Sequence, residues 1–207
     1  MMKDSYKTLK KAGRAEIIEK KSRFIGLAAP AETEEDAQAL LQAARAEHKD
    51  ASHNVYAWIL GINGENPRQS DDGEPGGTAG APALGAISKL GVTNAIVIVT
   101  RYFGGILLGT GGLTRAYGQA ARESLADAGI AERFSYDEFL LTISYPLLSK
   151  FQHEFAKRGY TIKNPVYTED VKLGVFVRTP QADEFSRLSA DLSGGGAHIE
   201  FKSTVYL

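Results

Sequence analysis

The sequence predicts an α+β protein of two domains, on the strength of two patterns and one change in composition. In the first part of the chain, an apolar strand leads through a glycine-rich loop into a helix that ends at Gly129. The remainder follows the order strand, helix, strand, strand, helix, strand, which is the ferredoxin-like pattern. Charge, glycine content and motif density change near Arg133. We therefore expect one domain over residues 1–133 and a second, ferredoxin-like domain over residues 134–207.

Each element of the first domain has its own local signal. β-branched and basic residues over 15–30 predict two strands that meet at a bend near Lys21. Thr33 is followed by three acidic residues, which is typical of a helix N-terminus. Later strands are apolar runs, and later helices end at glycines. The elements expected after the first helix are a strand at 53–60, a helix at 84–90, a strand at 94–103 and a helix at 113–128.

The second domain also contains residues that typically begin and end helices. Pro146 and Pro180 are placed to open helices, and Gly159 and the three glycines at 194–196 are placed to end them. The strands expected around these helices lie at 138–145, 160–167, 171–179 and 198–206.

The composition excludes several classes of protein. The chain has 24 basic and 25 acidic side chains, and its net charge of -1 argues against a polycation that coats nucleic acid. It has no cysteine, which removes disulfides, thiolate metal sites and a cysteine nucleophile. No apolar run approaches the roughly 20 residues of a membrane span, and no export signal is visible. We expect a cytoplasmic protein with no membrane partner and without a metal or other cofactor.

Positive charge is concentrated at the start of the chain. Residues 1–23 contain eight basic and three acidic side chains, a local charge of +5. One interpretation is a solvated, partly frayed N-terminal edge of the fold. The other is an electrostatic footprint for RNA, because clustered lysines and arginines neutralise backbone phosphates.

Residues 61–82 are expected to form a long loop with neither helix nor strand, because they contain many glycines and prolines and little that is apolar. Loops of this length inside compact domains are usually functional or disordered. The candidate residues in this loop are Ser70, Asp71, Asp72, Gly73, Glu74 and Thr78. Three alternatives are open for its carboxylates. They bind Mg²⁺ beside a substrate phosphate, they accept local backbone hydrogen bonds, or one pairs with Arg101 or Arg115 and holds two loops together.

A second glycine loop, GGILLGTGG at 104–112, comes directly before a helix. Unpaired N–H groups at a helix start attract anions, and glycines let a phosphate approach them. The candidate anion or nucleic-acid site comprises Arg101, Tyr102, Gly104, Gly105, Gly109, Gly111, Gly112, Thr114 and Arg115. The two arginines would clamp a phosphate. Tyr102 and Phe103 would stack on a base or, as continuations of the apolar strand, belong to the core. The structural alternative is that the glycines permit tight packing while Arg101 sits in a salt bridge.

Two motifs give a family resemblance. The segments SDDGEPGGTAGAP (70–82) and VTRYFGGILLGTGGLTRAYGQA (99–120) resemble motifs of the IMPACT family, in its bacterial YigZ-type branch. The resemblance covers about residues 20–129, and residues 136–207 are similar to the small C-terminal domain of bacterial members. It implies a left-handed βαβ first domain, like domain 2 of a ribosomal small-subunit protein. It also implies a ferredoxin-like second domain that resembles domain V of elongation factor G.

The resemblance implies association with nucleic acid or the ribosome, without an established reaction. It also carries over the signature positions Pro75, Gly80, Thr100, Leu113 and Tyr117. The leading hypothesis is a non-enzymatic regulator linked to translation that binds RNA or the ribosome through the arginine-bracketed glycine loop. One alternative is an enzyme that acts on a phosphorylated small molecule or nucleotide with Mg²⁺. The other is a protein-interaction module. No catalytic residue is assigned, since no nucleophile stands in a recognisable catalytic context.

Overall fold

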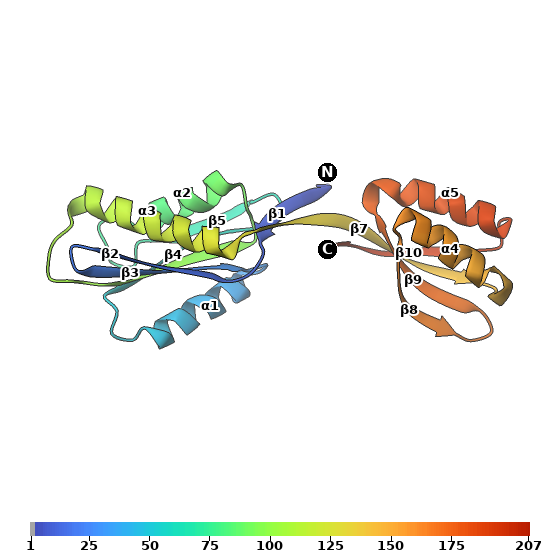
Figure 1. The fold of residues 1–207 in the computed structure, drawn as a ribbon, viewed down its shortest axis with the longest axis horizontal. Helices are drawn as coiled ribbons and strands as arrows, with labels where there is room; N and C mark the ends of the chain where they lie inside the picture. The colour runs from blue at the N-terminus through green and yellow to red at the C-terminus, as the bar shows by residue number, and fades with distance from the viewer. Residues whose placement is uncertain (1–2) are drawn as a thin grey trace. The chain divides into compact units, whose positions relative to one another are not determined.

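The computed structural model describes residues 3–207, which form two compact units (Figure 1). The first unit comprises Tyr6–Glu132. The second comprises Arg133–Leu207 together with residues 3–5. Each unit has its own hydrophobic core.

The first unit is built on a five-stranded antiparallel sheet. Its strands are β2 (Gly13–Glu19), β3 (Ser22–Pro30), β4 (His53–Leu60), β5 (Asn66–Ser70) and β6 (Ala95–Tyr102). They lie in the order β2-β3-β6-β4-β5. The helices are α1 (Glu34–Glu47), α2 (Gly80–Leu90) and α3 (Gly109–Ala128). Helix α1 covers one face of the sheet, and α2 and α3 cover the other (Figure 1).

Strand β6 is central because both of its faces are buried. Ile96 and Ile98 pack under α1, while Val97 and Val99 belong to the core beneath α2 and α3. A strand covered on both sides needs apolar residues at every position, which explains the uninterrupted run in the sequence. The predicted strand is therefore confirmed, and it ends by delivering Arg101 to the edge of this core.

The second unit has the predicted ferredoxin-like arrangement. Its elements are β7 (Ile130–Ile143), α4 (Leu148–Arg158), β8 (Thr161–Tyr167), β9 (Val171–Arg178), α5 (Ala182–Ser193) and β10 (His198–Tyr206). The strands lie in the order β10-β7-β9-β8, and all neighbours are antiparallel. Phe151 and Phe155 of α4 and Phe185 of α5 pack into one core with the sheet. Within residues 3–207, no helix has the length and apolar character needed to cross a membrane.

The long loop expected at 61–82 is interrupted by a strand. Residues Asn66–Ser70 form β5, which pairs with β4 at the edge of the sheet. Most of its side chains are exposed and polar, so no alternation of apolar and polar residues marks it in the sequence. An edge strand also tolerates a proline, here Pro67, because one side of its backbone has no partner strand.

Two helices begin earlier than the sequence predicts. Helix α3 starts at Gly109, so Gly111 and Gly112 lie within its first turn and do not precede it. Helix α2 starts at Gly80 and not at Leu84. Glycine disfavours helix by about 1 kcal/mol relative to alanine, but packing against the sheet stabilises these helices beyond their intrinsic propensity.

The basic N-terminal segment is ordered where the structure describes it. Strand β1 (Ser5–Leu9) pairs with β7, and the Lys7 carbonyl accepts a 2.9 Å hydrogen bond from the Thr93 N–H. Fraying is therefore wrong for the strand residues, whereas the basic side chains of residues 3–21 are exposed to solvent, as the same interpretation expects. Residues 1 and 2 lie outside the described part of the chain. Strand β7 also begins at Ile130, eight residues before the predicted position.

Candidate functional site

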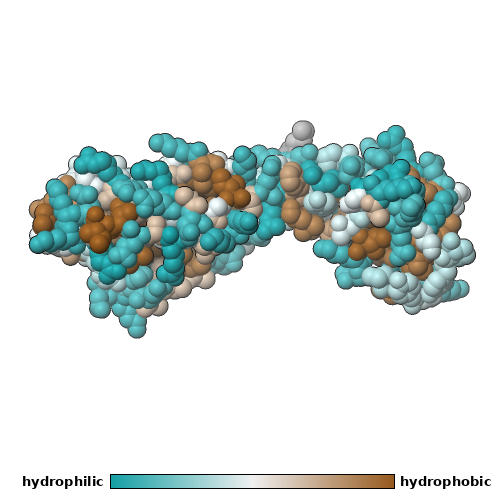
Figure 2. Space-filling model, viewed as in Figure 1, coloured by the Kyte–Doolittle hydropathy of each residue, from teal (hydrophilic) through white to brown (hydrophobic). Residues whose placement is uncertain are grey.

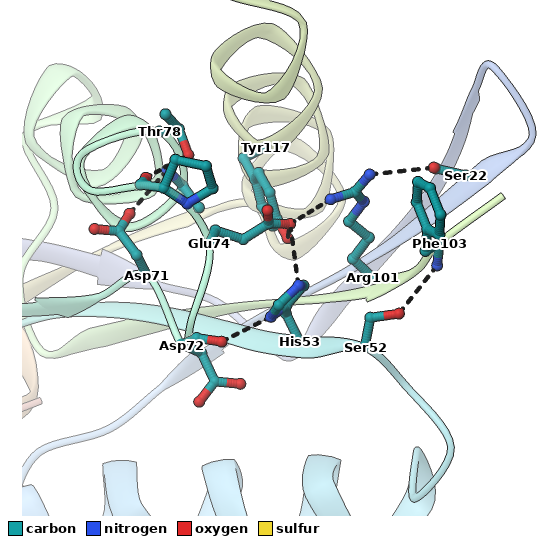
Figure 3. A network of polar contacts seen from close by, with 12 residues as sticks. Ser22, Ser52, His53, Asp71, Asp72, Glu74, Thr78, Arg101, Phe103 and Tyr117 are labelled. Carbon is teal, nitrogen blue, oxygen red and sulfur yellow. Dashed lines mark hydrogen bonds and ion pairs between the residues drawn. The ribbon is translucent and has the colours of Figure 1, made fainter. Parts of the chain in front are cut away.

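A buried ion pair joins the two signature segments. An Arg101 Nη1 lies 2.6 Å from Glu74 Oε1, and the two side chains are only 6% and 4% exposed. The Tyr117 hydroxyl donates to the same Glu74 oxygen, also at 2.6 Å (Figure 3). Burial, together with the adjacent carboxylate, raises the pKa of Tyr117 far above its usual range. Glu74 therefore connects the 70–82 loop to β6 and α3 through two buried donors.

Arg101 is enclosed by further contacts. Its guanidinium carbon lies 5.4 Å from the ring centroids of both Phe24 and Phe103, and Nη2 donates to Ser22 Oγ at 3.4 Å. Its Nε is buried and has no hydrogen-bond partner among residues 3–207. These contacts match the alternative in which a salt bridge holds the loops together, because the guanidinium is not open to a phosphate from solvent.

The three carboxylates of the 70–82 loop bind different partners. Asp71 accepts hydrogen bonds from the N–H groups of Gly77, Ala79 and Gly80, at 2.8–2.9 Å, and so caps the start of α2. Burial alone would raise the pKa of Asp71, but these three donors hold it below its usual value. In the part of the chain that the structure describes, no three His, Cys, Asp or Glu side chains are grouped as metal ligands.

Asp72 fastens the same loop to β4 and α1. Its carboxylate accepts a 2.6 Å hydrogen bond from the Asn54 N–H and one of 3.1 Å from Arg45 Nη2. Its carbonyl lies 2.8 Å from His53 Nδ1, which must carry the hydrogen because a carbonyl only accepts. The other ring nitrogen, Nε2, then faces Glu74 Oε1 at 3.8 Å (Figure 3). His53 thus lies half-buried beside the Arg101–Glu74 ion pair, and the Asp72 backbone carbonyl fixes the orientation of its ring.

Smaller residues complete the loop. Ser70 Oγ accepts from the Asp72 N–H at 3.2 Å, and Thr78 Oγ1 donates to the Pro75 carbonyl at 2.7 Å. Gly73 has a φ of +88°, a conformation that side chains rarely adopt. Each candidate residue of this loop therefore has a polar contact within the first unit or, at Gly73, a special backbone conformation.

The glycine loop after β6 is fastened to the turn between β2 and β3. A Cβ on Gly104 would lie 2.1 Å from the backbone carbon of Lys21, so the two backbones are in direct contact. The Gly104 N–H donates to Ser22 Oγ at 3.1 Å, the hydroxyl that also accepts from Arg101. Gly105 and Gly109 both have positive φ, at +82° and +72°. At these positions the glycines serve close packing and turning.

We call the two segments that meet there, residues 18–21 and 103–107, the tip. Phe103 is 49% exposed and Leu107 is 83% exposed, and Ile18 and Ile106 are also open to solvent. Figure 2 shows hydrophobic patches on the first unit set within hydrophilic surface. Lys20 and Lys21 of the same segment as Ile18 are also exposed. The tip therefore offers cationic and apolar side chains together.

Arg115 lies near the tip and in different surroundings from Arg101. It is exposed on α3 and lines a hollow of about 250 Å³ whose lining also includes Gly112, Gln119 and the end of β2 from Ile17 to Glu19. Thr114 is exposed beside it and donates to the Thr110 carbonyl. The predicted pair of arginines is thus divided into one buried and one exposed residue.

The Tyr102 side chain contacts His48 and Arg23. Its hydroxyl lies 3.0 Å from His48 Nδ1, and the Arg23 guanidinium carbon lies 5.6 Å from its ring centroid. The neighbouring Phe103 is the more exposed aromatic residue.

Ser22 belongs to the site but cannot be predicted from the sequence. It joins β3 to Arg101 and to the glycine loop, and these partners lie about 80 positions away in the chain.

Replacing Gly104 by alanine is expected to displace the glycine loop. The added Cβ would overlap the Lys21 backbone, which cannot rotate away, and overpacking of this kind costs about 1–3 kcal/mol. Urea unfolding would measure the loss, and backbone NMR shifts would locate the displacement at the tip. Gly105→Ala would be a poor control, because the backbone of Gly105 has a positive φ. Gly76→Ala is a better control: its added Cβ would have no atom within 4 Å, so this variant should unfold like the parent protein.

Comparisons with known proteins agree with this two-unit organisation. Residues 20–125 match the Impact N-terminal domain, and residues 141–195 match a domain of unknown function, DUF1949. The chain is 37% identical over 206 residues to "IMPACT family member YvyE" of Bacillus subtilis, covering 100% of this chain and 95% of that protein. It is also 37% identical over 182 residues to "IMPACT family member YigZ" of Escherichia coli, covering 87% and 89% respectively.

A eukaryotic relative and a solved structure are also similar to this chain. A "Protein IMPACT homolog" of Saccharomyces cerevisiae is 33% identical over 116 residues, which is 55% of this chain and 45% of that protein. A solved structure titled "Crystal structure of an hypothetical protein" superposes with a TM-score of 0.69 at 34% identity, covering 98% of this chain and 99% of that chain. From the family match and these identities, the chain belongs to the IMPACT family.

Proposed function

We propose that this protein is a non-enzymatic, translation-linked regulator that binds RNA, free or in the ribosome, through the tip and the adjacent Arg115. The observation that carries the proposal is the presence of unpaired cations beside an exposed aromatic ring. Among residues 3–207, Lys20, Lys21 and Arg115 have no ion-pair partner. Cations that track phosphates, combined with aromatic rings that stack on bases, are the usual means of binding single-stranded nucleic acid.

In this proposal, Arg101 positions the loop and does not touch RNA. Its ion pair with Glu74 and its contact with Phe103 fix the end of β6, and Ser22 fixes the glycine loop to the β2–β3 turn. A preformed loop loses little conformational entropy on binding. The glycine loop thus contributes its shape, while Lys20, Lys21 and Arg115 supply the positive charge.

The test is RNA binding by fluorescence anisotropy, with a single strand and a hairpin, at about 50 and about 200 mM salt. A triple variant, Lys20→Gln with Lys21→Gln and Arg115→Gln, is compared with a triple variant that loses the same charge elsewhere. That control changes Lys49, Arg133 and Lys172 to glutamine, which are exposed and outside the tip. We expect the tip variant alone to bind weakly, with a salt slope on single strands reduced by about 2, since each phosphate contact contributes about 0.7.

Equal loss in both triple variants would show that only overall charge matters and would contradict a site at the tip. Absence of binding by the parent protein at about 50 mM salt would exclude direct RNA recognition, because electrostatic binding is strongest at low salt. Phe103→Leu provides a further check. It keeps an apolar residue but removes the stacking surface, which is worth about 1–3 kcal/mol per base.

The exposed aliphatic residues favour a protein-interaction module as a second candidate function. Leu107 is 83% exposed, and neighbouring Ile106 and Ile18 extend the apolar surface. RNA gains little from aliphatic contacts, whereas the cores of protein interfaces use them. Leu107→Ser should leave RNA affinity unchanged if the tip binds RNA alone, and should abolish capture of a protein partner if it serves as a docking surface.

A further inference from the structure

A second hollow lies on the helical face of the first unit, between α2 and α3. Its volume is about 640 Å³. Most of its lining is apolar and includes Gly85, Ala86, Leu90, Gly118 and Leu125. Its polar side chains are those of Lys89, Thr114 and Arg122. Small-molecule sites in proteins commonly have volumes of about 300–1,000 Å³ and combine apolar walls with a few polar groups.

The two cations at this hollow lack partners. Over residues 3–207, neither Lys89 nor Arg122 makes an ion pair or a side-chain hydrogen bond. Arg122 is directed toward the hollow, because a Cβ on Gly118, one turn earlier in α3, would lie 3.1 Å from its Nη1. Gly118 thus leaves room for the guanidinium, and it also brings α3 close to Pro82 of α2.

From this arrangement we infer that the α2–α3 hollow binds a small amphipathic carboxylate. The apolar body lies against Ala86, Leu90 and Leu125, and the carboxylate is held by Arg122 and Lys89. An arginine fork suits a carboxylate because its two N–H groups match the two oxygens. Both walls come from helices of one compact unit, so the site is complete within a single chain. This inference stands apart from RNA binding, since Lys89 and Arg122 lie outside the tip.

Gly85 offers a way to close the hollow without disturbing the fold. It lines the hollow within α2, and a Cβ there would meet nothing within 4 Å. Its φ is also outside the left-handed region, so a side chain is tolerated. Gly85→Leu would therefore fill the space that the ligand body requires. Ser88→Leu is the matched control, because it adds the same side chain to an exposed position of α2 that does not line the hollow.

The experiment titrates sodium decanoate, below its micelle concentration, into the isotope-labelled protein and follows backbone amide shifts by NMR. Decanol, which has the same apolar chain without the charge, is titrated in parallel. We expect saturable shifts at the residues that line the hollow, with decanol binding at least 10-fold more weakly. Gly85→Leu should abolish the shifts, and Ser88→Leu should keep them. Arg122→Gln and Lys89→Gln should each weaken decanoate binding by about 10-fold, the usual size for a hydrogen bond to a charged group.

Several results would overturn the inference. They are the absence of saturable shifts with the parent protein, shifts that map elsewhere, or unchanged binding by Gly85→Leu. Equal affinity for decanol and decanoate would also overturn it, because the carboxylate would then have no role. Circular dichroism and thermal unfolding of every variant establish that a loss of binding does not come from a loss of fold.

Discussion

Replacing Glu74 by alanine is expected to destabilise the first unit by about 3–5 kcal/mol, because the Arg101 guanidinium then stays buried without its counter-charge. The Tyr117 hydroxyl also loses its acceptor. The protein contains one tryptophan, Trp58, which is buried in the first unit. Urea unfolding followed by its fluorescence therefore reports this unit separately from the second.

Two comparisons sharpen this prediction. Glu34→Ala removes an ion pair with Arg68 in which both side chains are 53% exposed, and it should barely move the midpoint. The double variant Glu74→Leu with Arg101→Met should lose less stability than Glu74→Ala, because no buried charge is left unpaired. A loss below about 1 kcal/mol for Glu74→Ala would contradict a supporting role for this ion pair.

Replacing Asp71 by alanine is expected to destabilise the same unit by about 2–3 kcal/mol, at the upper end for a helix cap. The N–H groups of Ala79 and Gly80 at the start of α2, and that of Gly77 in the loop before it, lose one shared acceptor. Asp50→Ala is a suitable control, since Asp50 is an exposed residue outside this loop. A loss equal to that of the control would show that solvent replaces the cap.

The effect of Asp71 should also depend on pH, with a defined sign. Its pKa in the folded protein lies below the ordinary value of about 3.9 that it regains on unfolding. The stabilising contribution is therefore fully present above that ordinary value and is lost as the pH falls through the lower, folded pKa. The difference in unfolding free energy between the parent and Asp71→Ala should shrink as the solution is acidified from about pH 5. A difference that grows on acidification would contradict the cap.

The sequence predicts those parts of the fold whose signals are local. Thr33 forms the expected helix start, with its side chain bonded to the Asp36 N–H and the Asp36 carboxylate bonded back. The buried run of β6 and the order of elements in the second unit are likewise confirmed. Strand β5 is missed because its side chains face solvent, and the start of α3 is missed because glycines there follow tertiary packing.

The candidate site was only partly predictable for a related reason. Its two segments stand out in the sequence as unusual loops, and pairing of an acid with Arg101 is one of the alternatives they allow. Which acid pairs is decided by the long-range approach of the loops. Glu74 pairs with Arg101, while Asp71 binds backbone N–H groups and Asp72 binds the Asn54 N–H and Arg45. Arg115 is exposed while Arg101 is buried, because Arg115 lies on the solvent face of α3. The distance between the two residues in the sequence does not reveal this difference.

The membership of residues 3–5 in the second unit has a consequence for synthesis on the ribosome. The Asp4 carbonyl accepts a hydrogen bond from the Ser135 N–H at 2.9 Å, and the Tyr206 hydroxyl donates to the Lys3 carbonyl at 2.7 Å. All residues of the first unit have been made once Glu132 emerges, and domains generally fold as units in the order of their synthesis. Asp4 therefore finds its partner as soon as the start of β7 has emerged, whereas the Lys3 carbonyl receives its hydrogen bond only after β10 has been translated.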